Sequence, residues 1–229
     1  MKKVITFNLW GNKAIYNIGA IKNAELAKTF YPDFECWFYV HQESVPNETI
    51  KELEKNNNTK IIFKNGDLNT CKPMMWRFEA IDEIDVEIMM SRDTDTRFLL
   101  REKLAVDEWL NSDKLFHIMR DHPMHQELIM GGMFGIKKNN IIQNWCSLIN
   151  DYNQNNESYM YDQYFLRDYI YPLIKDNVLI HASFSKFEGD KCNNFPIHYD
   201  NDYNFVGQYV YENEETNYYH RECIKNTLF

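Results

Sequence analysis

The amino-acid sequence predicts an α/β fold in which a mostly parallel central sheet is flanked by helices. Three observations support this prediction. Short apolar runs of strand length alternate with longer segments that have helical periodicity. Proline residues or an Asn-Gly pair mark several of the boundaries. The chain has 229 residues, of which 44% are apolar, so it is long enough to bury one large core. Such alternation brings strands together in parallel, with helices on both faces of the sheet.

The first half of the chain alternates regularly between the two kinds of segment. Strands are expected at Lys3–Leu9, Glu35–Val40, Lys60–Lys64 and Val86–Met90. Helices are expected between them at Ile18–Phe30, Pro46–Lys55 and Pro73–Ile84. Proline at the start of the second and third helices is favourable, because the first helical N–H has no intrahelical partner.

The second half is less regular. Helices are expected at Leu99–Leu110, Ile141–Ile149 and Tyr161–Ile174, and strands at Leu115–Met119, Ile129–Ile136 and Asn177–Ile180. From about Glu188 onward the sequence has no clear period, so we expect this segment to wrap across the sheet. The polar stretches Glu54–Thr59 and Asn150–Ser158 are too short to separate domains. Residues 1–229 are therefore expected to form a single domain.

Composition excludes several classes of protein. The net charge of −9 argues against a nucleic-acid-binding protein, which needs a basic face. No apolar stretch approaches the roughly 20 residues of a transmembrane helix. The N-terminal sequence MKKVITFNLWGN has only a short apolar segment and no cleavage site, so it is interpreted as a first strand and not as a signal peptide. The five cysteines are scattered and form no C-x-x-C motif, which favours a reduced, cytoplasmic chain.

The segment Val86–Phe98, with the sequence VEIMMSRDTDTRF, carries the main chemical signal. An apolar strand leads into Asp93 and Asp95, and residues two apart in an extended chain point to the same side. Two neighbouring carboxylates repel unless a cation lies between them, and Mg²⁺ or Mn²⁺ prefers such oxygen ligands together with phosphates. Arg92 and Arg97 flank the pair and could contact the same phosphates. A polar turn with ordinary loop aspartates explains the motif equally well.

The order of these elements, with D-x-D after the fourth strand, resembles that of a GT-A glycosyltransferase. The pattern is similar to the retaining galactosyltransferase and glycogenin type, and to the small glycosyltransferase domain of a large chlorella-virus protein. The resemblance covers Lys3 to Gly207. It implies a nucleoside-diphosphate sugar donor, UDP-linked, and a glycan or other hydroxyl acceptor. It also implies transfer with retention and a Mn²⁺ or Mg²⁺ cofactor.

The resemblance also implies roles for individual residues. Asp93 and Asp95 match the metal-binding pair, with Asp93 also beside the donor. Arg77 and Asp121 match residues that contact the donor, and Gly131-Gly132 matches a small-residue strand that faces sugar and acceptor. Asp162 and Gln163, in YDQYFL, match the D-Q pair beside the anomeric carbon. Asn204 stands where the family has a third metal ligand, a histidine, and the chain offers His181 or His198 instead.

Each candidate also has a purely structural interpretation. Arg77 could be a solvated helix arginine, Asp121 a turn residue, Asp162 an N-cap, Gly131-Gly132 a packing bulge and His181 a half-buried histidine. Trp10 could stack on a nucleotide base or simply pack. His125 is interpreted as a surface histidine with no role.

Two other functions compete with sugar transfer. An aspartyl-nucleophile phosphatase or phosphotransferase uses D-x-D-x-T, but Arg97 occupies the threonine position here, and that motif normally follows the first strand. A non-catalytic sugar-nucleotide-binding module would bind the donor without turnover.

Overall fold

A computed structural model describes residues 1–152 and 159–228 of the chain. Its strands are β1 (Lys2–Leu9), β2 (Phe34–His41), β3 (Thr59–Lys64), β4 (Val86–Ser91), β5 (Phe116–Arg120), β6 (Phe134–Lys137), β7 (Val178–Ala182) and β8 (Cys192–Asn193). They form one sheet in the order β3-β2-β1-β4-β6-β5-β7-β8. Every neighbouring pair is parallel except those of β6, which runs antiparallel to β4 and β5. The predicted mostly parallel sheet is confirmed.

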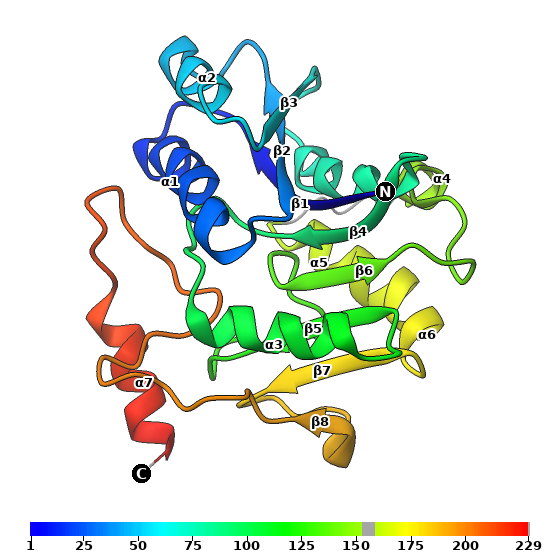
Figure 1. Ribbon diagram of the computed structural model, residues 1–229, viewed down its shortest axis with the longest axis vertical. Helices are drawn as coiled ribbons and strands as arrows, with labels where there is room; N and C mark the ends of the chain where they lie inside the picture. Colours follow the sequence, from blue (N-terminus) through cyan, green and yellow to red (C-terminus); the bar gives the residue numbers. More distant parts are fainter. Residues whose placement is uncertain (153–158, 229) are drawn as a thin grey trace.

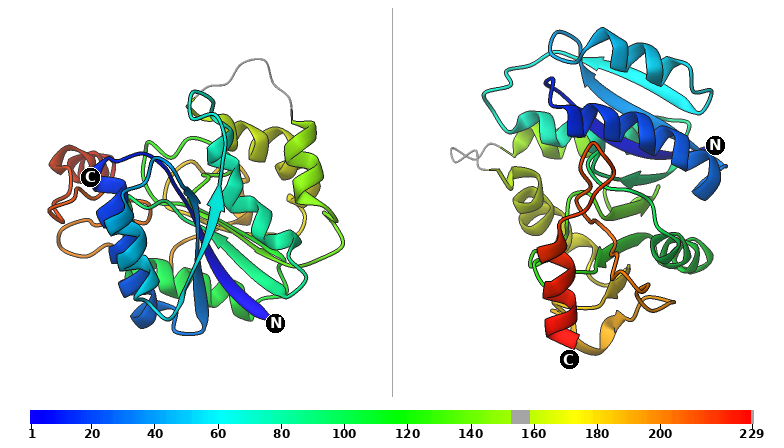
Figure 2. Two further views of the ribbon diagram at one scale, coloured as in Figure 1. Left: turned by 90° about the horizontal axis from the view of Figure 1, so that it is seen from above. Right: turned by 90° about the vertical axis from the view of Figure 1, so that its left-hand side faces the viewer.

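Helices cover both faces of the sheet (Figures 1 and 2). One face carries α1 (Ala14–Phe30), α2 (Asn47–Glu54) and α3 (Leu100–Asn111). The other carries the 3-10 helix η1 (Lys72–Asp82), α4 (Trp145–Asp151), α5 (Tyr161–Phe165), the π-helical turn η2 (Leu166–Ile170) and α6 (Tyr171–Ile174). Strand β1 shows why both faces are covered. Ile5 and Phe7 pack in the core beneath α1, α2 and α3, whereas Val4 packs in the core on the opposite face. Alternate side chains of a strand point to opposite faces of the sheet.

The remaining elements lie after β7. A short 3-10 turn, η3 (Gly189–Lys191), precedes β8, and α7 (Tyr218–Leu228) ends the described chain. Between them the chain runs along the carboxyl ends of the central strands, as expected. The N–H of Val206 donates to the Asp121 carboxylate after β5, and the N–H of Val210 donates to the Asp95 carbonyl after β4. This segment therefore packs against the edge of the sheet where ligands bind in such folds.

Several elements differ from the prediction, four of them in ways that have a clear physical reason. The helix expected at Pro73–Ile84 is a 3-10 helix. The strand expected at Ile129–Ile136 begins only at Phe134, after a turn. The helix Tyr161–Ile174 contains a π-helical turn directly before Tyr171-Pro172, where proline removes a backbone donor. Helix α7 was not expected, because Ile224 is its one buried residue and leaves little apolar periodicity.

Three further expectations concern local features. In the stretch Asn150–Ser158, Asn150 and Asp151 close helix α4, whereas residues 153–158 lie outside the described chain. Cys36, Cys146, Cys192 and Cys223 carry free thiols. Across the residues that the structure describes, no helix has the length and apolarity needed to cross a membrane.

Candidate active site

A pocket of about 490 Å³ lies at the carboxyl ends of β1 and β4. Most of the residues singled out from the sequence line it: Trp10, Arg77, Asp93, Asp95, Gly131, Gly132, Asp162 and Gln163. They come from the loops after β1 and β4, the turn before β6, and helices η1 and α5. Residues up to 153 positions apart in sequence, Trp10 and Gln163, thus meet in one cavity.

The turn after β4 is held by three separate elements. The N–H of Arg92 still bonds the Thr6 carbonyl of β1 at 3.0 Å, and the chain then leaves the sheet. The side-chain amide of Asn23, on α1, donates to the carbonyls of Asp93 and Thr94 at 3.4 and 3.3 Å. The N–H of Val210 caps the Asp95 carbonyl at 2.8 Å. The two aspartates are therefore fixed by backbone contacts that do not involve their carboxylates.

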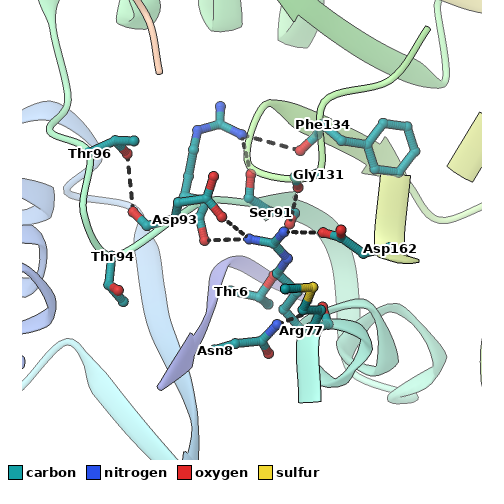
Figure 3. A network of polar contacts seen from close by, with 12 residues as sticks. Thr6, Asn8, Arg77, Ser91, Asp93, Thr94, Thr96, Gly131, Phe134 and Asp162 are labelled. Atoms are coloured by element: carbon teal, nitrogen blue, oxygen red, sulfur yellow. Dashed lines mark hydrogen bonds and ion pairs between the residues drawn. The ribbon is translucent and has the colours of Figure 1, made fainter. Parts of the chain in front are cut away.

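Arg77 joins two carboxylates at the wall of the pocket (Figure 3). Its guanidinium is buried, forms an ion pair with Asp93 and donates to Asp162 Oδ2 at 2.6 Å. Burial raises the pKa of Asp162, and the charge of Arg77 opposes that rise. The N-cap of α5 is Met160, and no side chain caps it. The solvated-arginine and N-cap interpretations of Arg77 and Asp162 are therefore wrong.

Gly131 and Gly132 make room for this ion-pair network. A Cβ on Gly131 would lie 2.2 Å from Asp162 Oδ2, and one on Gly132 would lie 2.0 Å from Asp93 Oδ2. Any larger residue would push a carboxylate away, since no real Cβ contact is that short. We expected a ligand to approach these glycines; in the structure, the close neighbours are the charged side chains themselves.

Several polar atoms of the pocket are left unsatisfied by the described chain. Asn8 Oδ1, Arg77 Nε and Gln163 Oε1 are buried without a hydrogen-bond partner. The half-buried Asp95 carboxylate forms no ion pair with any described residue. Burial, together with the charge of Asp93, raises the pKa of Asp95 to about 7. Buried polar atoms without a protein partner normally meet water or a ligand. These three atoms are sealed from solvent, but they belong to residues that line the pocket, and the 44% exposed Asp93 side chain makes its wall polar.

The paired carboxylates fit a divalent cation that arrives with its substrate. Their mutual repulsion favours a cation between them. Among the described residues, however, no group of three His, Cys, Asp or Glu side chains is placed to hold a metal. Mg²⁺ and Mn²⁺ are commonly held by one or two carboxylates, waters and substrate phosphates. Asp93 and Asp95 match such a shared site better than a closed site built by protein alone.

Arg92 and Asp121 do not line the pocket, and their predicted donor contacts are wrong. Arg92 is buried and donates to Glu102 Oε1 and to the Ser91 carbonyl, both at 2.7 Å. The Asp121 carboxylate is fully buried and accepts hydrogen bonds from Arg101, Ser183, Tyr199 and the N–H of Val206. Both side chains are saturated by the protein and have no capacity left for a substrate.

His181 cannot serve as the third metal ligand. Its Nδ1 bonds His117 Nε2 at 2.9 Å, and its Nε2 bonds Glu108 Oε2 at 2.8 Å. The ring is fully buried and does not line the pocket. His198 is exposed and also lies off the pocket lining. Arg97, expected near phosphates, pairs with Glu214 at 2.8 Å instead.

The structure adds residues that the sequence interpretation missed. Lys13, Tyr16 and Tyr159 line the pocket, and so does His125, which we had interpreted as an exposed residue without a role. His125 is buried. The available signal was its position four residues after Asp121, beyond a strand end, where functional side chains gather in α/β folds.

Comparison with known proteins identifies the fold. No family model matches the sequence, and no curated protein matches it. The chain is similar to a glycosyltransferase involved in the glycosylation of the major capsid of PBCV-1, with a TM-score of 0.52 and 14% identity over 80% of this chain and 82% of that one. The galactosyltransferase LgtC, solved with donor and acceptor sugar analogs, has a TM-score of 0.44 and 18% identity over 76% of this chain and 72% of that one. A 4-diphosphocytidyl-2C-methyl-D-erythritol synthase from Anaerococcus prevotii has a TM-score of 0.45 and 11% identity over 73% of this chain and 84% of that one. The first of these similarities confirms the GT-A fold.

Proposed function

We propose that the protein is a metal-dependent, cytoplasmic glycosyltransferase. It would transfer the sugar of a nucleoside-diphosphate sugar, UDP-linked, to a hydroxyl group of a glycan or other acceptor, with retention at the anomeric carbon. One observation carries this proposal. Arg77 connects the Asp93 and Asp162 carboxylates at the wall of a pocket where the Asp95 carboxylate has no ion-pair partner in the described chain.

The strand order supports one orientation of the proposed donor. Trp10 follows β1, Asp93 and Asp95 follow the adjacent β4, and Gly131-Gly132 precede β6, the next strand along the sheet. The aromatic side chains of Trp10 and Tyr16 suit a nucleobase, and the carboxylate pair suits the cation of a diphosphate. The sugar would then extend toward Gly131, where Asp162 and Gln163 also line the pocket.

The chemistry follows from the charges. Asp93 and Asp95 would hold Mn²⁺ or Mg²⁺ together with the donor phosphates, and the bound cation would neutralise charge on the departing diphosphate. Arg77 keeps the Asp162 carboxylate oriented and lowers the cost of its charge in a buried position. The Asp162 carboxylate would stabilise positive charge on the sugar as the glycosidic bond lengthens. Gln163, which lines the pocket beside Asp162, would contact a sugar or acceptor hydroxyl.

A thermal-shift screen with UDP, UDP-glucose and UDP-galactose, with and without Mn²⁺, tests the proposal. A ligand present at a hundred times its Kd stabilises the folded state by about 2.7 kcal/mol, or about 5–10 °C for a chain of this size. We expect a nucleotide-dependent shift that requires Mn²⁺, followed by transfer of the sugar in a turnover assay.

Asp95→Asn should abolish the Mn²⁺-dependent shift and the transfer. The matched control is Asp107→Asn, which also replaces a carboxylate by an amide but lies on the outer side of α3, paired with Lys103. Near-normal turnover of Asp95→Asn in Mn²⁺ would contradict the proposal. Binding of nucleotide sugar without any turnover would instead support a non-catalytic binding module.

A further inference from the structure

His125 is held in a defined position at the end of the pocket formed by the loop after β5. Its N–H donates to the His122 carbonyl at 2.9 Å, and its ring Nδ1 accepts the N–H of Asp121 at 3.1 Å. The direction of the Asp121 N–H is fixed, because the Asp121 carboxylate accepts hydrogen bonds from Arg101 and Ser183. The imidazole ring is therefore oriented by the backbone of a rigid residue.

This contact determines which ring nitrogen carries the proton. Because Nδ1 accepts a hydrogen bond, its lone pair is occupied and the proton of the neutral ring resides on Nε2. Burial, together with the neighbouring His122 and His220, lowers the pKa of His125 to about 3. The ring therefore remains neutral at physiological pH. A nitrogen that bears a proton cannot bind a metal ion, so His125 does not replace the missing third ligand.

The Nε2–H group faces a place where a ligand can reach it. It has no hydrogen-bond partner in the described chain, and it is not among the sealed, unsatisfied atoms of the interior. The ring lines the pocket together with Met133 and Gly207. A Cβ on Gly207, which has a φ of +81°, would come within 3.3 Å of His125 Cε1. Glycine at this position leaves room for the His125 ring and for Met133 Sδ, which a Cβ would approach to 2.6 Å.

The strand order places His125 relative to the donor. Neighbouring strands are about 4.8 Å apart, and β6 lies between β4 and β5. The loop after β5 therefore begins about 10 Å from the strand that carries Asp93 and Asp95, on the side away from β1 and Trp10. If the nucleoside occupies the Trp10 side, the transferred sugar lies on the side of His125.

We propose that His125 is a fixed, neutral hydrogen-bond donor that recognises an oxygen of the sugar carried by the nucleotide donor. The proposal rests on the proposed glycosyltransferase function. It assigns to His125 the sugar contact that the resemblance had implied for Asp121. Asp121 instead acts through its backbone N–H, as the residue that positions the imidazole.

The tautomer can be tested without any ligand. We expect ¹⁵N–¹H NMR of the wild-type protein to show His125 as the Nε2–H form, with no titration between pH 5 and 8. Assignment of the Nδ1–H form, or titration of His125 within this range, would overturn the proposal. This measurement keeps its value even if no nucleotide binds, so failure of the proposed function and failure of the His125 proposal are distinguishable.

Calorimetry with UDP, UDP-glucose and UDP-galactose tests the sugar contact. His125→Asn can still accept the N–H of Asp121 but does not reach into the pocket. We expect it to weaken binding of a UDP-sugar by about 3- to 10-fold, the range of one neutral hydrogen bond, while the affinity for UDP stays within about twofold. His125→Gln extends an amide N–H further and should recover part of the loss. Equal loss for UDP and UDP-sugar, or no loss for either, would contradict the proposal.

Discussion

Two aspartates that follow central strands, Asp93 after β4 and Asp121 after β5, look alike in sequence but differ in their environments. Each is paired with an arginine. The Asp93 side chain is 44% exposed and lines the pocket, whereas that of Asp121 is 0% exposed. Asp121 receives hydrogen bonds from three side chains and one backbone N–H.

The difference shows how to separate a functional carboxylate from a structural one. A buried carboxylate whose acceptor positions are all filled by protein joins segments of the fold, and it has nothing left to offer a ligand. Asp121 connects α3, β7 and the C-terminal segment in this way. Among the described residues, the Asp93 carboxylate forms an ion pair with Arg77 alone, and its neighbour Asp95 forms none. In the proposed function, this carboxylate pair is the part of the sheet edge that a cation and a diphosphate would complete.

The largest effect should come from Asp121→Ala. Removing one partner of a buried ion pair leaves the Arg101 charge uncompensated and costs about 3–5 kcal/mol. Urea denaturation should show this loss in the free energy of unfolding. The matched variant Asp93→Ala should cost less than about 1 kcal/mol, because its partner stays paired with Asp162 and the site is partly solvated. Similar losses for the two variants would remove the distinction between them.

The next effect concerns Asp162, which shares Arg77 with Asp93. Asp162→Asn should lower kcat by about 10²- to 10³-fold, the scale of one lost electrostatic contact in a transition state, while donor affinity is retained. Loss of the buried ion pair should also lower stability by about 1–3 kcal/mol. The decisive measurement is the rate at saturating donor and acceptor. A rate within a few-fold of wild type would remove Asp162 from the reaction and weaken the proposal of retention.

The smallest effect is the pH dependence that Asp95 confers. Its pKa is raised from 3.8 to about 7, so between these values the folded state binds more protons than the unfolded state. Stability of the metal-free protein should therefore fall as pH rises through this range. Asp95→Asn should remove that slope and raise the stability and the Tm of the metal-free protein at pH 8, where the wild-type carboxylate is charged. A metal-free Tm that is unchanged by the substitution at pH 8 would show that the pair is not strained.

The same proton competes with the cation. Mn²⁺ affinity in the presence of UDP should rise from pH 5 to about 7 and then level off, because protonated Asp95 cannot bind a metal. Calorimetric titrations at several pH values measure this directly. The Asp107→Asn variant should follow the wild-type curve, because the carboxylate that it replaces does not line the pocket.

The sequence was sufficient to predict the fold and most of the residues that line the candidate pocket. Apolar runs of strand length and helical periodicity are local signals, and they correctly located the sheet and most helices. The aspartates after Val86–Met90 were also locally evident. Helix α7 and the 3-10 form of η1 were not, because one buried residue or a proline-led aromatic segment leaves no clear period.

What the sequence by itself determined was therefore which residues could act: a carboxylate pair at a strand end, an arginine before it, a D-Q pair and two adjacent glycines. Only the tertiary structure decided which of them face a cavity. Asp121 is saturated by Arg101, 20 residues earlier, and by Ser183, 62 residues later, whereas Arg77 meets Asp162 across 85 residues. His125 lines the pocket, where the N–H of Asp121 orients its ring and Gly207 leaves room for it. The physical reason is that hydrogen-bond saturation depends on segments brought together by sheet packing, and periodicity along the chain carries no record of those partners.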